Sequence, residues 1–161
     1  MASRRKGRIL AFQALYSWDT QYSQNSDTSI PEGLLDFSWV PQDVPLNEEM
    51  TAFSRLLVTG TVENVAKVDD LIQQHLQNWE IKRLNRVDLA VLRMSVYTLM
   101  FQSDMPAAIV IDEAVDISKE FGADDSYRFV NGVLDSIRKT LESNTFDSNT
   151  FDSKVTNPAP K

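Results

Sequence analysis

The stretch from Phe121 to Ile137, FGADDSYRFVNGVLDSI, decides the fold because it ends one helix and starts another. Gly122 can adopt the left-handed conformation that often terminates a helix. Asp124 or Asp125 can then accept hydrogen bonds from the free amides of the next helix. The apolar residues that follow have helical spacing and need only one buried face; they are Val130, Val133, Leu134, Ile137 and Leu141. The stretch therefore predicts two helices joined by a short connection.

The second of these helices carries aromatic, basic and amide side chains beside its apolar stripe, namely Tyr127, Arg128, Phe129 and Asn131. Phe129 is offset by about 100° from Val130, so it borders the stripe and does not lie at its centre. Such a composition suits unpaired nucleotides, because bases stack on aromatic rings and phosphates attract cations. Core packing explains Phe129 equally well, and Arg128 and Asn131 also fit an ordinary solvated surface.

Helical periodicity continues through the rest of the chain, and no strand pattern competes with it. We expect helices or helical turns over residues 8–19, 31–37, 47–77, 79–85, 87–102, 109–121 and 124–141. The segment 87–102 is apolar nearly all round, which is typical of a central, buried helix. Gly60 costs the longest helix about 1 kcal/mol relative to alanine, so it marks close packing or a bend. The fold class is therefore all-α, with about seven helices.

The composition predicts one domain, over residues 1–142, followed by a tail. A chain of 161 residues with 42% apolar and 24% charged residues is long enough to bury a hydrophobic core. Residues 143–161 contain the sequence NTFDS twice in succession and end in NPAPK. This polar direct repeat is poor in apolar residues, so we expect it to be disordered and dispensable for the core function.

The residues that would build a catalytic, cofactor or metal site are missing from the sequence. The chain has no cysteine and one histidine, His75, so neither a catalytic triad nor a multi-histidine metal site is possible. It also lacks a Gly-rich phosphate loop, a GxSxG motif and zinc-ligand spacing. We therefore predict a protein that is not an enzyme and that holds no cofactor and no metal.

The sequence also indicates where the protein resides. No apolar run approaches the roughly 20 residues that span a bilayer. The start, MASRRKGRIL, is basic but has no long apolar region and no cleavage site, so a secretory signal is not expected. We predict a cytoplasmic protein without membrane contact.

The charge is negative overall but positive at the N-terminus. A net charge of −7 argues against a general polyanion binder, because nucleic-acid affinity comes largely from Lys and Arg. Arg4, Arg5, Lys6 and Arg8 form a basic cluster that could contact RNA phosphates. If the first helix extended backward, Arg8 would lie near the centre of its apolar face, so we expect these residues to project as an arm. A disordered solvating terminus is the alternative.

Two further side chains have both a structural and a binding interpretation. Tyr16 lies at the edge of the first helix's apolar face, where it could present its ring to a base or simply pack with its hydroxyl in water. Asp125 is first a helix-start acid that complements the helix dipole. It could also accept hydrogen bonds from base amino groups.

Arg93 indicates a second site on the central helix. The helical wheel places it among Leu89, Tyr97 and Met100. A guanidinium with apolar neighbours needs a carboxylate partner, which lies either inside the protein or on another protein. Arginine beside tyrosine is also a common composition for an interface hot spot.

Four segments of the sequence resemble a known family. They are Gln13–Trp18 (QALYSW), Ala90–Tyr97 (AVLRMSVY), Asp104–Pro106 (DMP) and Phe121–Ile137. Together they resemble the NusB family of transcription antitermination factors. The resemblance runs in order from about Arg4 and is dense over residues 87–137, but looser over residues 20–79.

The resemblance implies a fold and two binding surfaces. The family arranges its helices as two three-helix subdomains. Its RNA face corresponds to Arg4, Arg5, Lys6, Arg8, Tyr16, Asp125, Arg128 and Phe129. Its surface for the ribosomal protein NusE corresponds to Asp88 and Arg93, with Tyr97 nearby. Lys82 and Gln102 differ from the family's usual residues at the partner surface.

The implied function is that of an RNA-binding adaptor. With NusE, it would bind a single-stranded boxA-like element in ribosomal RNA leader transcripts and help the RNA polymerase antitermination complex resist termination; DNA is not an expected ligand. Two alternatives remain. A NusB-like domain also occurs at the N-terminus of ribosomal RNA cytosine methyltransferases, so this chain could target such an enzyme in trans. It could also be a helical scaffold that binds proteins only.

Overall fold

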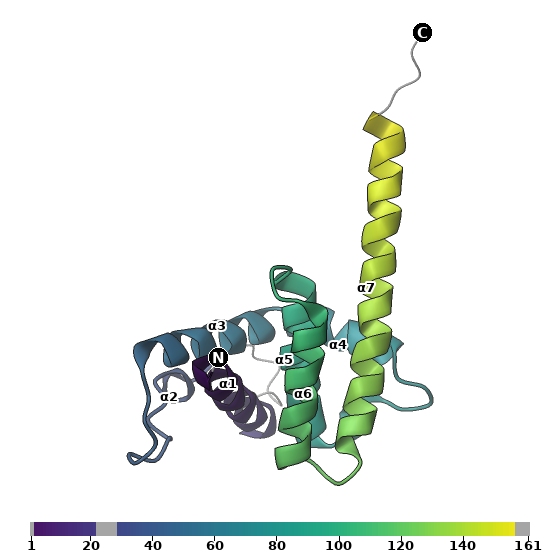
Figure 1. Ribbon diagram of the computed structural model, residues 1–161. Helices are drawn as coiled ribbons and strands as arrows, with labels where there is room; N and C mark the ends of the chain where they lie inside the picture. The colour runs from purple at the N-terminus through teal and green to yellow at the C-terminus, as the bar shows by residue number, and fades with distance from the viewer. Residues whose placement is uncertain (1, 22–28, 157–161) are drawn as a thin grey trace.

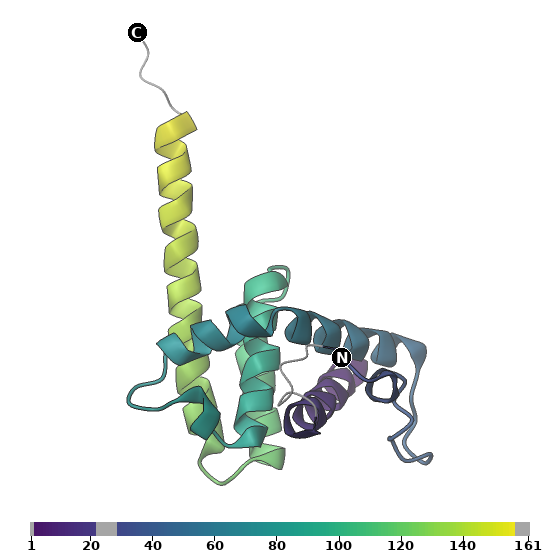
Figure 2. The same cartoon turned by 180° about the vertical axis from the view of Figure 1, so that it is seen from behind.

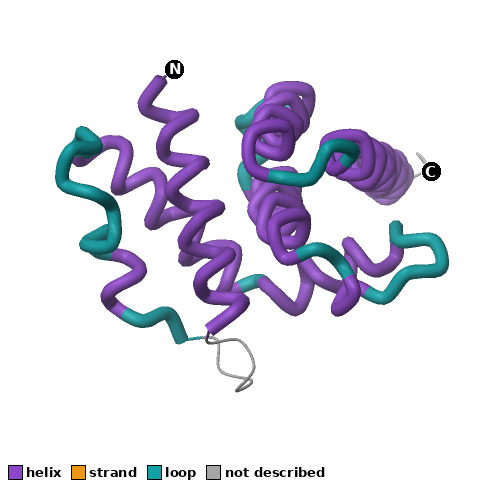
Figure 3. The backbone as a smooth tube through the Cα atoms, turned by 90° about the horizontal axis from the view of Figure 1, so that it is seen from below, coloured by secondary structure: helices purple, strands orange, loops and turns teal. Residues whose placement is uncertain are grey.

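The computed structural model describes residues 2–21 and 29–156, and within these ranges every regular element is helical (Figure 3). The elements are α1 (Ala2–Gln21), α2 (Glu32–Leu35), α3 (Glu48–Glu63), α4 (Val65–Gln74), the short 3-10 helix η2 (Ile81–Arg83), α5 (Arg86–Phe101), α6 (Ala107–Phe121) and α7 (Ser126–Thr156). The prediction of an all-α protein with about seven helices is confirmed. No helix in the described ranges is long and apolar enough to cross a membrane.

Helix α5 forms the centre of the molecule. Its residues from Asp88 to Thr98 are all buried, and the helix packs against α1, α3, α4, α6 and α7. Asn85 starts it, because the Asn85 side chain accepts a hydrogen bond from the Val87 amide at 2.8 Å. The prediction of a buried central helix over 87–102 is therefore confirmed.

The other helices lie on two sides of α5. Figures 1 and 2 show α1, α2 and α3 on one side, with α6 and α7 side by side on the other. Helix α4 packs against α5, where Asp69 reaches Arg93, and also contacts α7. One main hydrophobic core runs through both groups, so α1 and α7, which are far apart in sequence, are held against the same central helix.

The segment predicted as one long helix over 47–77 is two helices in the structure. The start is as predicted, since the Asn47 side chain accepts a hydrogen bond from the Met50 amide at 2.8 Å. The break falls at Asn64, whose side-chain amide donates to the Gly60 carbonyl at 2.8 Å. A side chain that competes for a helix carbonyl lets the chain change direction. Because apolar spacing continues across Asn64, periodicity did not reveal the break.

Gly60 marks close packing. A Cβ atom at this position would lie 2.2 Å from the Tyr97 ring of α5. Only a residue without a side chain lets α3 approach α5 this closely. Of the two readings of Gly60, close packing is confirmed, and the bend lies four residues further on.

Helix α7 extends further than predicted. It continues to Thr156, through both NTFDS repeats, where we expected a disordered tail from residue 143. Neither glycine nor proline occurs between Gly132 and Pro158, so the sequence has no strong helix breaker there. Figure 1 shows this C-terminal half of α7 standing away from the other helices. Residues 157–161 of the expected tail lie outside the described residues.

Candidate nucleic-acid interface

The basic N-terminus is the first part of helix α1. The expectation of a projecting arm is wrong, because α1 begins at Ala2 and its basic residues contact α3 and α6. Arg5 lies 3.2 Å from Glu113 and 2.7 Å from Asp116, both on α6. The Arg4 guanidinium lies 4.6 Å from the centre of the Phe53 ring. These contacts explain why α1 begins at Ala2, before residue 8, where the predicted helix started.

Arg8 is a buried cation. It is 9% exposed, its guanidinium lies 3.8 Å from Glu113, and it donates a hydrogen bond to the Met105 sulfur at 3.6 Å. Burial lowers the pKa of Arg8 from its usual value, although the charge of Glu113 opposes this. Arg8 therefore joins α1 to α6, whereas Arg4 and Lys6 are exposed to solvent.

Tyr16 lies on the exposed surface of α1. Two contacts show that α1 and α6 run in the same direction. Arg5 pairs with Glu113, and further along both helices Phe12 packs on Phe121, with ring centres 5.3 Å apart. Tyr16 follows Phe12 by one helical turn on the same face. This face therefore leads to the α6–α7 connection. Tyr16 is 40% exposed, so its ring is accessible.

The start of α7 carries the other three residues of the predicted RNA face. The backbone carbonyl of Asp125 accepts a hydrogen bond from the Arg128 amide at 3.1 Å, which begins the helix. The side chains of Asp125 and Arg128 are exposed. Phe129 is half-buried against the core, next to the fully buried Val130. Phe129 therefore packs against the core and keeps part of its side chain exposed, which is compatible with both interpretations that the sequence left open.

Gly122 ends α6 in a different way from the one predicted. Its backbone is extended, with φ −94° and ψ −178°, and is not left-handed. A Cβ atom would lie 2.8 Å from the Ser118 carbonyl oxygen and 2.9 Å from Cβ of Ser126. Lack of space therefore explains the glycine, and the close approach keeps the end of α6 beside the start of α7.

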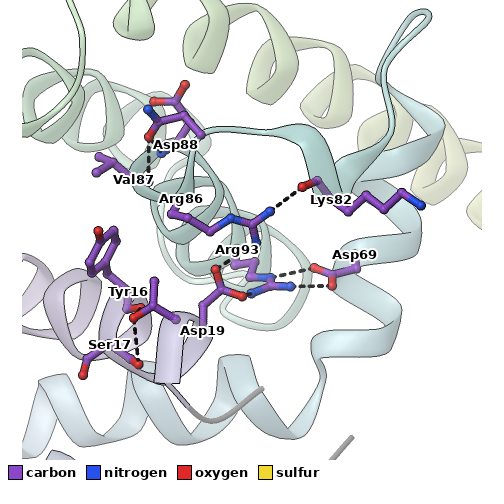
Figure 4. A network of polar contacts seen from close by, with 11 residues as sticks. Tyr16, Ser17, Asp19, Asp69, Lys82, Arg86, Val87, Asp88 and Arg93 are labelled. Atoms are coloured by element: carbon purple, nitrogen blue, oxygen red, sulfur yellow. Dashed lines mark hydrogen bonds and ion pairs between the residues drawn. The ribbon is translucent and has the colours of Figure 1, made fainter. Parts of the chain in front are cut away.

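Arg93 is neutralised inside the protein (Figure 4). It forms two hydrogen bonds to Asp69 of α4, at 2.9 and 2.8 Å, and one to Asp19 of α1, at 3.1 Å. Asp19 also accepts a hydrogen bond from Arg86 at 3.0 Å. Burial acts to lower the pKa of Arg93, but these carboxylates outweigh it and the pKa is raised. Of the two partners that the sequence allowed, the structure contains the internal one.

The three residues predicted to bind NusE are all buried. Asp88, Arg93 and Tyr97 are each 8% exposed. One carboxylate oxygen of Asp88 has no hydrogen-bond partner. Burial raises the pKa of Asp88, and a hydrogen bond with the Ser126 side chain partly opposes this. The Tyr97 ring covers Gly60. These residues pack between α5 and its neighbouring helices, and they do not form an exposed surface.

Sequence reasoning missed the acids that hold these cations in place. Asp19 and Asp69 bind Arg93, and Glu113 contacts both Arg5 and Arg8. The buried arginine in α5 indicated that such partners exist. Their identity depends on the tertiary fold, since Asp19 is 74 residues from Arg93. In the part of the chain that the structure describes, no group of three or more histidine or acidic side chains is arranged to hold a metal ion.

The fold and these side chains define a class: a small all-α domain that presents aromatic and basic residues on α1 and α7. The family model for NusB matches residues 5–139. Transcription antitermination protein NusB from Treponema denticola is 50% identical over 135 residues, which are 84% of this chain and 95% of that protein. The same protein from Treponema pallidum is 47% identical over 137 residues, 85% of this chain and 93% of that protein.

Solved structures agree with these relatives. NusB from T. maritima matches with a TM-score of 0.70 at 36% identity, covering 84% of this chain and 90% of that chain. A crystal structure of the antitermination factors NusB and NusE in complex with double-stranded RNA matches with a TM-score of 0.74 at 28% identity, covering 87% of this chain and 98% of that chain. The chain belongs to the NusB family.

Proposed function

We propose that this protein is a transcription antitermination factor that binds a boxA-like single-stranded RNA in ribosomal RNA leader transcripts. It does so together with the ribosomal protein NusE and supports processive transcription by RNA polymerase. The positions of Tyr16 and Phe129 support this function most. Helix packing brings the accessible ring of Tyr16 on α1 toward the start of α7, where Phe129 is half-exposed.

The side chains on this face have complementary roles toward RNA. Tyr16 and Phe129 stack on unpaired bases. The exposed cations Arg4, Lys6 and Arg128 contact phosphates. Asp125 accepts hydrogen bonds from base amino groups, which adds selectivity. Arg5 contacts RNA only if phosphate replaces one of its carboxylate partners on α6.

The charge distribution explains why a protein partner is required. The net charge is −7, and Arg5 and Arg8 already face Glu113 of the protein itself. Few cations therefore remain for phosphates, and RNA affinity depends strongly on their number. A partner such as NusE adds contact area and holds the RNA in register. Relatives solved as NusB with NusE and RNA are consistent with this arrangement.

We propose that NusE binds the exposed faces of the helices that pack around α5. Asp88, Arg93 and Tyr97 act there by fixing the helices that carry the exposed contact residues, since each is buried. We further propose that the protein performs no covalent chemistry and works in the cytoplasm. Both follow from a role in which it holds RNA and a ribosomal protein near RNA polymerase.

A fluorescence titration tests the function. Labelled boxA-like RNA, a scrambled RNA of equal length and a double-stranded version are each titrated with the protein, with and without its cognate NusE. We expect selective binding of the single-stranded boxA-like RNA, tightened by NusE. Equal affinity for all three RNAs, with NusE shown to be bound, would contradict the proposal.

A further inference from the structure

One tyrosine at the junction of α6 and α7 holds two cations. The Nζ atom of Lys119, in the last turn of α6, lies 5.1 Å from the centre of the Tyr127 ring. The guanidinium carbon of Arg128 lies 5.6 Å from the same ring. Arg128 also donates a hydrogen bond from Nε to the Tyr127 hydroxyl at 3.0 Å. Cation–π contacts at these distances are attractive, so both cations are held within about 6 Å of one ring.

These two cations are exposed and are not paired with acids of the protein in the part of the chain that the structure describes. Among the described residues, neither Lys119 nor Arg128 forms an ion pair with a carboxylate, whereas Arg5, Arg93 and Lys139 do. Both side chains are exposed. The terminal nitrogens of Arg128 make no hydrogen bond within the described part of the chain. Two exposed cations that share one ring and form no ion pair can both contact a bound anion.

The surroundings decide which anion fits. The acids Glu120, Asp124 and Asp125 lie nearby in the sequence and are exposed, and none of them forms an ion pair with Lys119 or Arg128 within the described residues. These three acids would repel an acidic protein surface, because such a surface brings many negative charges close to them. An RNA strand instead presents separate phosphates at regular intervals. Phe129, which directly follows Arg128, offers an accessible ring for the base beside such a phosphate.

We propose that Lys119, Tyr127 and Arg128 form a clamp for one phosphodiester of the RNA strand. Lys119 and Arg128 contact the phosphate oxygens, and Tyr127 is a positioning residue that holds the two cations together. Since α6 supplies Lys119, the clamp extends the RNA face beyond α1 and α7. This inference rests on the proposed function and adds a binding position to it.

The test compares the affinity for boxA-like RNA, with NusE present, across a series of salt concentrations. The variants are Lys119→Gln, Tyr127→Leu and Tyr127→Phe, and Lys67→Gln on the exposed side of α4 is the matched control. We expect Lys119→Gln to weaken binding severalfold and to make the log–log salt slope shallower by about 0.7, the value for one phosphate on a single strand. Tyr127→Leu should weaken binding and also make the slope shallower. Tyr127→Phe keeps the ring and should remain closer to the wild type.

The outcomes separate the clamp from the proposed function. Wild-type selectivity for boxA-like RNA, with Lys119→Gln indistinguishable from Lys67→Gln, would overturn the clamp and leave the function in place. Loss of wild-type selectivity over a scrambled RNA would overturn both. A thermal melt of each variant shows whether it is folded. If Tyr127→Leu fails to fold, Lys119→Gln alone decides the question, because its side chain is exposed.

Discussion

Arg93 of α5 lies 3.1 Å from Asp19 of α1 and thereby ties the central helix to the C-terminal end of the first helix. Asp19 follows Tyr16 by three residues, so the two share one side of α1. The ion pair therefore fixes the turn of the helix that presents Tyr16. The buried ion pair between Arg93 and Asp19 thus helps to fix the position of the exposed Tyr16 ring.

Removal of Asp19 should destabilise the protein strongly. Asp19→Ala leaves Arg93 with Asp69 alone and removes a hydrogen bond from Arg86. Loss of one partner of a buried ion pair costs about 3–5 kcal/mol. Urea unfolding measures the change in free energy. Glu80→Ala, which removes an exposed partner of Lys82, is the control. Equal effects of the two substitutions would show that the buried network adds nothing.

Two glycines should respond to alanine with opposite signs. Gly60→Ala places a Cβ atom 2.2 Å from the Tyr97 ring and forces α3 and α5 apart. We expect destabilisation by about 1–3 kcal/mol. Gly132→Ala has open space around its Cβ atom and should stabilise α7 by about 0.5–1 kcal/mol. The melting temperatures of both variants test this. A fall for Gly132→Ala or a rise for Gly60→Ala would contradict the packing.

Asp88 should make stability depend on pH in an unusual direction. Burial raises its pKa in the folded state above the unfolded value, so the folded state binds the proton more tightly. The penalty for the ionised form is absent below the unfolded pKa, about 3.9, and complete above the folded pKa. Asp88→Asn should therefore be more stable than the wild type at pH 7, and this advantage should disappear at low pH.

Unfolding free energies across pH test this prediction. Asp36 is a control of opposite sign, because the Ser38 amide donates to its carboxylate at 2.9 Å and lowers its pKa. Asp36→Asn should lose a little stability at neutral pH and match the wild type in acid. If Asp88→Asn followed the same course, the carboxylate would not be penalised by burial.

Two substitutions should distinguish the contribution of base stacking to RNA affinity from the contribution of charge. Phe129→Leu keeps an apolar side chain against the core but removes the ring. Affinity for boxA-like RNA should fall about tenfold or more, with little change in its salt dependence, since one base stack contributes about 1–3 kcal/mol. Lys6→Gln should weaken binding less but make the salt dependence shallower. The same salt slope for both variants would mean that these roles are assigned wrongly.

The sequence predicted the parts of the fold that depend on local patterns. The buried α5, the start of α3 at Asn47 and the close α6–α7 junction follow from apolar spacing, a capping residue and a glycine. It did not predict the break at Asn64, because apolar spacing continues across it. The place of Arg8 was also missed, since only packing of α1 on α6 brings Glu113 near it.

For the candidate site too, the sequence predicted some features and the fold was needed for the others. Arg93 signalled a carboxylate partner, but Asp19 and Asp69 were identified only when the helices were assembled. The contact of Lys119 with Tyr127 likewise requires the fold, because it joins the end of one helix to the start of the next. Residue types indicate the chemistry of a site, and tertiary packing decides which of them meet.

Removal of α7 beyond Glu142 should leave the stability and the RNA affinity of the protein nearly unchanged. Leu141 is the last α7 residue, among those whose side chains the structure describes, that packs against the core. A chain ending at Glu142 should therefore melt within about 2 °C of the full chain, a shift that corresponds to well under 1 kcal/mol. RNA affinity should be unchanged. A large loss of stability would show that the helix beyond this point supports the core.

Photocrosslinking measures the central claim most directly. BoxA-like RNA carrying 4-thiouridine is irradiated in complex with the protein and NusE, and the crosslinked peptides are identified by mass spectrometry. We predict crosslinks to the α1 segment that contains Tyr16 and to the start of α7 around Phe129. Crosslinks confined to α3 or α4, with the two predicted segments unmodified, would contradict the proposed RNA face.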